Sequence, residues 1–307
     1  MNQSELRVAV GLLLCLLLGS WCAARSDERP LASARTAIPK RVVSLAPSVT
    51  ETIFALGLGD RLVGVTTYCD YPAAAKRLPK IGGFMNPSLE AIVAKRPDLV
   101  IGVSSATDPA KAREMAGLGL SVNLISLSTL RDILDSMKTI ARLLGAPEAG
   151  ETLAGQIVTQ IEDVKKHIQH VTRRSTLLVV GIRPLIAVGR KNFIDELITL
   201  AGGENIVGSA SQPWLNVPEE LVVAKAPQVI IEAGMGSERD DSNKRWRDLT
   251  SVPAVKEGRV YSYPSDKILR PGPRVGEALA EIARLIHPEC FASRSRSEEN
   301  RCEYFRP

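Results

Sequence analysis

Few residues of this chain have the type and spacing that catalysis requires. His167 and His170 stand three residues apart, which would place both side chains on one surface of a helix, where they could hold a metal ion. No third ligand is evident nearby, so we favour an ordinary solvated helix surface. The third histidine, His287, precedes Pro288 and is expected at a helix end. Cys69 could act as a nucleophile, but nothing visible in the sequence would activate its thiol.

Other motifs of catalysis and nucleotide binding are missing from the sequence. It has no Gly-x-Ser-x-Gly elbow, no phosphate loop and no Gly-x-Gly-x-x-Gly after an expected strand. It also has no Cys-x-x-Cys pair, which leaves a zinc ribbon or a thioredoxin-like site without support. We therefore expect no catalytic residue and no metal site, although an exported α/β enzyme that uses Cys69 remains an alternative. The net charge of +5 is spread without a basic stripe, so we expect no nucleic-acid partner.

A binding site is a better match to the chemistry that the loops offer. Aromatic residues make up only 4% of the chain, yet Tyr68, Phe84 and Trp214 all fall in expected loops, where they could contact a ligand or pack at domain edges. Cations in loops would favour an anionic part of a ligand if they converge, and are otherwise solvated surface charges. The candidate ligand-binding residues are Tyr68, Phe84, Ser104, Arg183, Trp214, Lys267 and Arg270, with Ser48 in a further loop of the same kind.

Expected strands and helices alternate along the chain. Strands are predicted at 41–45, 61–66, 98–103, 122–127, 175–182, 229–233 and 259–263, with helices between them. Short βα units of this kind predict parallel sheets that are covered by helices on both faces. In open α/β sheets, ligands bind beyond the carboxyl ends of the strands, where the candidate loops lie. Ser48 with Glu51 forms a plausible capping box at the start of the first helix.

An internal repeat indicates two related lobes. Residues 88–101 resemble residues 218–231, with Glu90 opposite Glu220 and a shared Val-Ala-Lys-x-Pro core. Residues 56–64 resemble residues 200–208 in the same order. One such pair could arise by chance in any α/β protein, but two pairs in one order favour duplication. The sequence therefore predicts an N-terminal α/β lobe at 41–146 and a C-terminal α/β lobe at 174–288.

One long helix is predicted between these lobes, at 147–173. Its apolar residues recur every three or four positions, and Pro147 suits its first turn. A helix of roughly 27 residues would be about 40 Å long, more than the width of one small domain. It could lie along one large domain, but the repeat favours a strut between two lobes. Because bending a helix disturbs its backbone hydrogen bonds, we expect a largely preformed cleft and little hinge closure.

Both ends of the chain differ in composition from the lobes. Arg7 precedes an apolar run that ends in small residues, as in a secretory signal at 1–24 with cleavage near Ala24, followed by a flexible leader at 25–40. Lipid attachment at Cys22 is an alternative that Trp21 disfavours. The polar tail at 289–307 is expected to be disordered. In an oxidising compartment Cys290 and Cys302 could pair.

Four segments together give the chain a family resemblance. Residues 41–51, 67–72, 82–90 and 97–101 resemble the periplasmic substrate-binding proteins of cobalamin and ferric-siderophore ABC importers, over roughly 41–288. The resemblance implies two α/β lobes joined by one long backbone helix, with the ligand between them. It also implies a periplasmic location and a partnership with the permease subunits of an ABC importer. We expect the protein to be a monomer.

The resemblance also implies roles for individual residues. Glu90 and Glu220, one in each lobe, would pair with arginines of the permease, although each could simply interact with its own helix dipole. Cobalamin is the first choice of ligand because Tyr68 and Trp214 align with aromatic residues that flank the corrin. A ferric siderophore or haem is the alternative, because Ser104 and Lys267 stand where cobalamin binders tend to have tryptophans. No cofactor is expected apart from the transported chelate.

Overall fold

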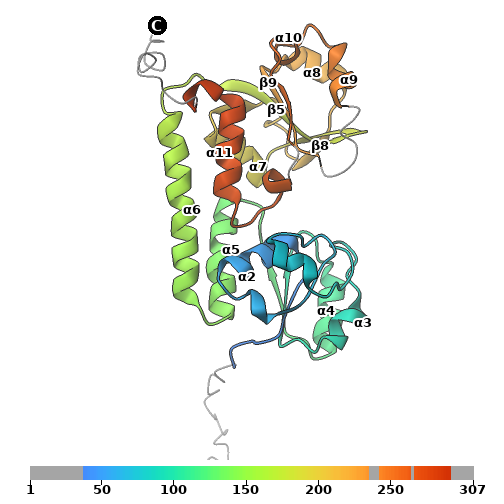
Figure 1. Cartoon of the computed structure of the whole chain (residues 1–307). Helices are drawn as coiled ribbons and strands as arrows, with labels where there is room; N and C mark the ends of the chain where they lie inside the picture. Colours follow the sequence, from blue (N-terminus) through green and yellow to red (C-terminus); the bar gives the residue numbers. More distant parts are fainter. Residues whose placement is uncertain (1–36, 235–241, 264–265, 292–307) are drawn as a thin grey trace, which may run out of the picture. The chain divides into compact units, whose positions relative to one another are not determined.

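Two β-sheets with helices on their faces make up the computed structural model, which describes residues 37–234, 242–263 and 266–291 (Figure 1). The predicted α/β fold class is confirmed. The first sheet is entirely parallel and has the strand order β2-β1-β3-β4. Its strands are β1 (Val42–Ser44), β2 (Leu62–Val65), β3 (Leu99–Val103) and β4 (Val122–Ile125), and its helices are α2 (Pro47–Ala55), α3 (Leu89–Ala94), α4 (Pro109–Gly117) and α5 (Leu130–Leu143).

The second sheet contains the same parallel arrangement with an antiparallel addition. Its parallel part has the order β7-β5-β9-β10, while β6 and β8 extend the sheet from the other part of β5. The strands are β5 (Arg174–Ile182), β6 (Leu185–Val188), β7 (Gly203–Asn205), β8 (Trp214–Asn216), β9 (Val229–Glu232) and β10 (Val260–Ser262). The helices are α7 (Phe193–Leu200), α8 (Glu219–Lys225), α9 (Ser242–Arg247), α10 (Pro253–Lys256) and α11 (Val275–Ile286).

Backbone geometry supports the duplication that the repeat indicated. Helices α3 and α8 are both followed by a non-glycine residue in the left-handed region, Arg96 with φ 46° and Ala226 with φ 44°, just before a proline. Helices α2 and α7 are followed by left-handed glycines, Gly57 with φ 75° and Gly202 with φ 77°. Gly57 therefore corresponds to Gly202, whereas the sequence comparison had placed it one position away. Two lobes with one strand order and matching helix ends are what duplication predicts.

Helix α6 (Pro147–His167) joins the lobes by packing against α5 of the first and α11 of the second (Figure 1). The approach of α6 to α5 is close, because a Cβ on Gly150 would lie 2.5 Å from the Cβ of Ala141. Gly276 of α11 is similarly covered by the side chain of Gln160. No helix within the described ranges is long and apolar enough to cross a membrane.

The end of the predicted helix, at residue 173, was wrong. Helix α6 ends at His167, and Ile168 is the C-cap with φ −110°, after which the chain turns toward β5. Ile168 is nonetheless buried, and the backbone N–H of Val171 donates to its carbonyl in that turn. Apolar residues of a turn can thus continue the three-to-four spacing of a helix. The helix that forms has 21 residues and a length of about 32 Å.

One apolar core extends through both lobes. Alternate strand residues point to opposite faces of each sheet, so Val42 and Leu178 enter the shared core while Val43 and Leu177 enter smaller cores on the outer faces. The shared core also takes buried side chains from α2, α5, α6, α7 and α11. The described residues from Pro39 onward accordingly cluster as one compact unit.

Helix α5 begins with a strong cap. Thr129 Oγ1 accepts from the N–H of Asp132, and the Asp132 carboxylate accepts from the N–H groups of Thr129 and Ser128 and from the Ser126 hydroxyl. Burial raises the pKa of Asp132, but these hydrogen bonds outweigh it and hold the pKa below its usual value. The cap fixes the chain just after Ser128, which lines the pocket described below.

The C-terminal end of the described chain shows where the predicted polar tail should begin. The predicted tail at 289–307 begins too early, since Glu289 pairs with Arg174 at 3.1 Å and Phe291 stacks on His167 with ring centroids 5.3 Å apart. His287 is the C-cap of α11, as predicted, and its Nε2 lies 3.1 Å from the carbonyl oxygen of Gly202. The predicted signal, Cys22, most of the leader and Cys302 lie outside the described residues.

Candidate functional site

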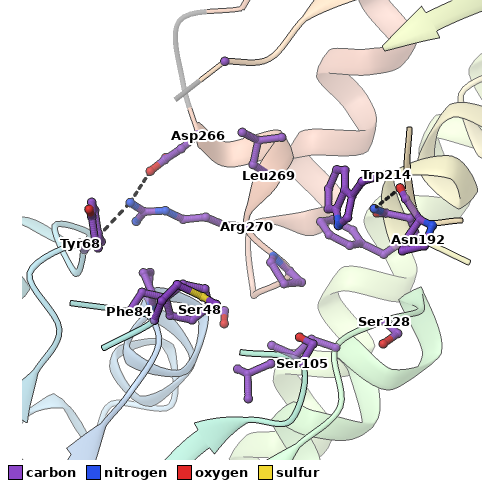
Figure 2. A pocket seen from close by; sticks show the side chains of 18 of the residues that line it. Ser48, Tyr68, Phe84, Ser105, Ser128, Asn192, Trp214, Asp266, Leu269 and Arg270 are labelled. Carbon is purple, nitrogen blue, oxygen red and sulfur yellow. Dashed lines mark hydrogen bonds and ion pairs between the residues drawn. The ribbon is translucent and has the colours of Figure 1, made fainter. Parts of the chain in front are cut away.

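A pocket of about 1120 Å³ is lined by residues of both lobes (Figure 2). In the first lobe, each strand of the parallel sheet supplies a residue just beyond its carboxyl end: Ser48, Tyr68, Ser105 and Ser128 follow β1, β2, β3 and β4 in turn. This is the edge at which parallel sheets bind ligands. The second lobe supplies Asn192, Trp214, Gly234, Asp266, Leu269 and Arg270 among others.

Aromatic and apolar side chains from both lobes face this pocket. Tyr68 is 62% exposed, Met85 67% and Trp214 47%, whereas Phe84 is half-buried against the core. Large apolar groups left this accessible in a concave site can contact the faces of a ligand. The structure therefore places all three predicted aromatic residues, Tyr68, Phe84 and Trp214, on one pocket.

The backbone around Trp214 is fixed by close contacts. Trp214 pairs with Val188 in the β6–β8 ladder, and the Gly189 N–H donates to the Pro213 carbonyl at 3.0 Å. Asn192, which lines the pocket, donates to the same carbonyl at 3.4 Å. A Cβ on Gly189 would collide with the backbone oxygen of Gln212, so glycine permits this approach. The ring of Trp214 is thus presented by a firmly held strand.

The two lobes are linked beside the pocket by an interlobe ion cluster, formed by Glu51, Asp70, Asp266, Arg270 and Arg274. The Glu51 side chain is 1% exposed and accepts from Arg274 Nε and Nη2 and from Arg270 Nη1, each at 2.8 Å. The predicted capping box of Ser48 with Glu51 was wrong, because the N-cap of α2 is Ala46. Glu51 instead anchors two arginines of the other lobe.

Further contacts complete this interlobe ion cluster. Arg270 pairs with Asp70 at 2.7 Å and with Asp266, and its Nη2 donates to the Tyr68 carbonyl at 3.2 Å (Figure 2). Burial lowers the pKa of Arg270, but the hydrogen bonds with Glu51 and Asp70 raise it above its usual value. Burial raises the pKa of Asp266, against the lowering effect of Arg270. Both lobes contribute carboxylates, and only the second contributes the cations.

Three predicted ligand-binding residues are not among those that line the pocket. Ser104 is exposed and donates its N–H to the Ile125 carbonyl, and its neighbour Ser105 lines the pocket instead. Arg183 is exposed in the turn between β5 and β6. Lys267 pairs with carboxylates of α11, Glu277 at 3.0 Å and Glu281 at 2.7 Å. The three predicted cations therefore do not converge, and of them Arg270 alone reaches the pocket.

Sequence reasoning missed the two aspartates of the pocket, Asp70 and Asp266. The available signal was their position, two residues after Tyr68 and one residue before Lys267 in loops already chosen as candidates. Asn192 was also missed; its side chain caps α7 by accepting from the N–H of Ile194 at 3.0 Å. Polar residues that serve the backbone in this way carry no separate sequence mark of a binding role.

The residues considered for catalysis lie elsewhere. Cys69 is buried, and its sulfur lies 3.2 Å from the hydroxyl oxygens of Thr50 and Thr66. His167 and His170 are both exposed. Within the part of the chain that the structure describes, no cluster of three or more His, Cys, Asp or Glu residues could hold a metal ion.

Glu90 and Glu220 occupy equivalent places, as the second residues of α3 and α8. Both are exposed, and neither has an ion pair among the described residues. By contrast, Glu219 next to Glu220 pairs with Arg245 at 2.9 Å. Each lobe therefore presents one uncompensated carboxylate at the start of a matching helix.

Sequence and structure comparisons identify known proteins that are similar to this chain. The chain is 30% identical over 243 residues to the vitamin B12-binding protein of Vibrio campbellii, covering 79% of this chain and 88% of that protein. Its structure resembles the periplasmic vitamin B12-binding protein BtuF of Vibrio cholerae, with a TM-score of 0.73, 27% identity and coverage of 83% and 99%. It is similarly close to the periplasmic haem-binding protein RhuT of Roseiflexus sp. RS-1, with a TM-score of 0.72, 27% identity and coverage of 82% and 99%.

A profile of the periplasmic binding proteins matches residues 42–267, which include both sheets and most of the pocket. Proteins of this kind work with the permeases of ABC transporters, and the relatives named above with known structures are periplasmic. The two-lobe fold, the repeat and the pocket between matching lobes agree with that assignment. This chain therefore belongs to the periplasmic binding protein family, whose members are transport receptors and not enzymes.

Proposed function

We propose that this protein captures cobalamin in the pocket between its lobes and delivers it to the permease of an ABC importer. The observation that carries the proposal is the set of aromatic side chains from both lobes, Tyr68, Phe84 and Trp214, around one pocket. The pocket volume of about 1120 Å³ exceeds the range of about 300–1,000 Å³ usual for small-molecule sites. A large corrin with apolar faces suits such a site, and the vitamin B12-binding relatives support this choice.

Binding would require little rearrangement of the lobes. The shared core, helix α6 and the interlobe ion cluster connect the two sides of the pocket. A preformed site lowers the entropy that association must overcome. The aromatic rings would contact the faces of the macrocycle while the serine and asparagine side chains at the strand ends hydrogen-bond to its amide groups.

Calorimetric titration of the mature protein with cyanocobalamin tests the proposal directly. We expect submicromolar binding with one ligand per chain and without chemical conversion of the ligand. Trp214→Ala should weaken binding at least tenfold, which is about 1.4 kcal/mol. Leu118→Ala is the matched control, because Leu118 is 57% exposed and lies outside the pocket lining. Absence of binding would remove cobalamin as the ligand, and equal affinities of the two variants would remove Trp214 from its binding site.

Haem is the second candidate. The chain resembles in fold the haem-binding RhuT, and Tyr68, whose side chain is exposed in the pocket lining, offers an accessible phenol. Haemin titration followed by absorbance distinguishes the two ligands, because a phenolate-bound haem has its own spectrum. A higher affinity for haemin than for cyanocobalamin would favour this candidate, and a ferric siderophore panel completes the comparison.

Delivery to a permease is proposed to use Glu90 and Glu220. Their exposure and equivalent positions would suit arginines on two copies of a permease subunit. Glu90→Ala with Glu220→Ala should leave ligand affinity unchanged and abolish uptake into vesicles that contain the permease. Glu148→Ala is the control, because Glu148 is likewise the exposed second residue of a helix. Full uptake with the double variant would refute the docking role.

The compartment follows from the proposed signal peptide. We propose export to the periplasm with cleavage near Ala24, and lipid attachment at Cys22 as the alternative. Mass spectrometry of the protein purified from the periplasm distinguishes an unmodified N-terminus after residue 24 from a lipid-modified Cys22.

A further inference from the structure

We propose that the interlobe ion cluster is a charge filter for the ligand, in which Asp70 and Asp266 are specificity-determining residues. Both carboxylates pair with N–H groups of Arg270, so the pocket surface that they form accepts hydrogen bonds and donates none. The pocket therefore selects chelates that present amide N–H groups to this surface over chelates that present carboxylates. The inference rests on the proposed function in taking this pocket as the chelate site.

The hydrogen-bonding capacity of Arg270 is largely consumed within the protein. A guanidinium has five N–H donors. Nη1 donates to Glu51 at 2.8 Å and pairs with Asp70 at 2.7 Å, while Nη2 donates to the Tyr68 carbonyl at 3.2 Å and pairs with Asp266. Arg274 donates to both oxygens of Glu51, its face is covered by the Tyr71 ring at 4.0 Å, and it is not among the residues that line the pocket. Neither arginine is thus disposed to receive a ligand anion.

The exposed fractions of the side chains in the interlobe ion cluster decide which charge a ligand in the pocket meets. The cluster contains three carboxylates and two guanidinium groups and therefore has a formal charge of −1. The side chains of Asp70 and Asp266 are 52% and 27% exposed, whereas that of Arg270 is 10% exposed. Both aspartates line the pocket. The side of the cluster that faces the ligand is consequently carboxylate.

Carboxylates accept hydrogen bonds and donate none. An amide N–H of a ligand placed against Asp70 or Asp266 gains a charge-assisted hydrogen bond, while a ligand carboxylate in that place meets two like charges. Lys191 also lines the pocket, from the loop after β6 in the second lobe. The filter is therefore local to the wall formed by Tyr68, Asp70 and Asp266, and the test must vary the charge of the ligand as well as the protein.

The test uses two matched pairs of ligands. Cyanocobalamin is compared with its monocarboxylic acids, in which one side-chain amide is hydrolysed, and haemin dimethyl ester is compared with haemin. We expect the uncharged side chain to be preferred by at least about tenfold in Kd in the pair that binds. Asp70→Asn and Asp266→Asn should each reduce that preference to about threefold or less. Asp135→Asn is the control, because Asp135 pairs with Arg131 on α5, outside the pocket lining, and its change alters the net charge equally.

The outcomes separate the filter from the proposed function. Loss of the preference in Asp70→Asn and Asp266→Asn, with the control unchanged, supports the filter whichever pair binds. If cyanocobalamin fails to bind but the porphyrin pair shows the preference, the proposed ligand is wrong and the filter stands. Equal affinity within both pairs, a preference that both aspartate variants retain, or binding of none of the four ligands overturns the filter.

Discussion

Replacing Glu51 with Gln should destabilise the protein by about 3 kcal/mol. The substitution keeps the size of the side chain but removes the charge that receives three hydrogen bonds of 2.8 Å from Arg270 and Arg274. Removing one partner of a buried ion pair typically costs about 3–5 kcal/mol, because the other charge remains buried. Arg270 keeps Asp70 and Asp266, so it contributes little to the loss.

Arg274 carries most of the expected cost of this substitution. Once Glu51 is neutral, the nearest carboxylate oxygen to Arg274 among the described residues belongs to Asp266, at 3.9 Å. The Arg274 side chain is only 11% exposed. The lower end of the range therefore applies. Urea unfolding should show a lower midpoint at an unchanged m-value, since the surface exposed on unfolding is the same.

A surface ion pair provides the control for Glu51→Gln. Glu219 pairs with Arg245 at 2.9 Å, but its side chain is 48% exposed, so Glu219→Gln should cost less than about 1 kcal/mol. A loss below about 1 kcal/mol for Glu51→Gln, equal to that of the control, would refute the view that the interlobe ion cluster holds the lobes together.

Four further outcomes follow from other parts of the structure. Gly189→Ala should weaken ligand binding, measured by calorimetry, because the added Cβ displaces the strand that presents Trp214; Gly155→Ala, on α6 outside the pocket lining and with open space around the added Cβ, should not. Gly150→Ala should cost about 1–3 kcal/mol in urea unfolding by overpacking α6 against α5. Thr129→Ala should cost about 1 kcal/mol in the same assay through loss of the α5 cap. The lowered pKa of Asp132 gives stability that is present above its unfolded value and lost as pH falls through the folded value, so Asp132→Asn should show a smaller loss of stability on acidification.

The alternation of strands and helices could be predicted from the sequence because its evidence is local and repeated, whereas the strand order and the antiparallel pairing of β6 and β8 were not predicted. Strands and helices alternate in short units, and residues 88–101 and 218–231 match in sequence. Both matched segments form a helix, a left-handed residue and a strand in the structure, at Arg96 and Ala226. Local patterns of this kind specify elements and their order well, since both lobes solve the same packing problem.

The pocket could be predicted only to within a residue or two. Strand ends were predicted to within two residues, but whether Ser104 or Ser105 faces the pocket depends on the strand pleat and on where β3 ends. Lys267 and Asp266 are neighbours on a short 3₁₀ helix, and of the two Asp266 lines the pocket whereas Lys267 does not. A side chain that is one position away points in a different direction, and a loop sequence does not determine that direction.

The role of Glu51 could not be predicted, for a different reason. Its partners, Arg270 and Arg274, are 219 and 223 residues away along the chain. In the sequence, a glutamate three residues after a serine has a sufficient local explanation as a helix cap. A pairing between lobes becomes visible only when the lobes are placed together.

The shared core has a consequence for how the chain is made. Its buried residues run from Val42 to Ile286, and α6 has its second neighbour only when α11 is present. Two lobes with separate cores could fold one after the other as they leave the ribosome, as domains generally do. Here the first lobe lacks the packing partners of one of its faces, and the arginines that pair with Glu51, until the last residues have been translated. A growing chain therefore stays incompletely folded until synthesis is nearly finished, which is the state in which a polypeptide can be threaded through a membrane.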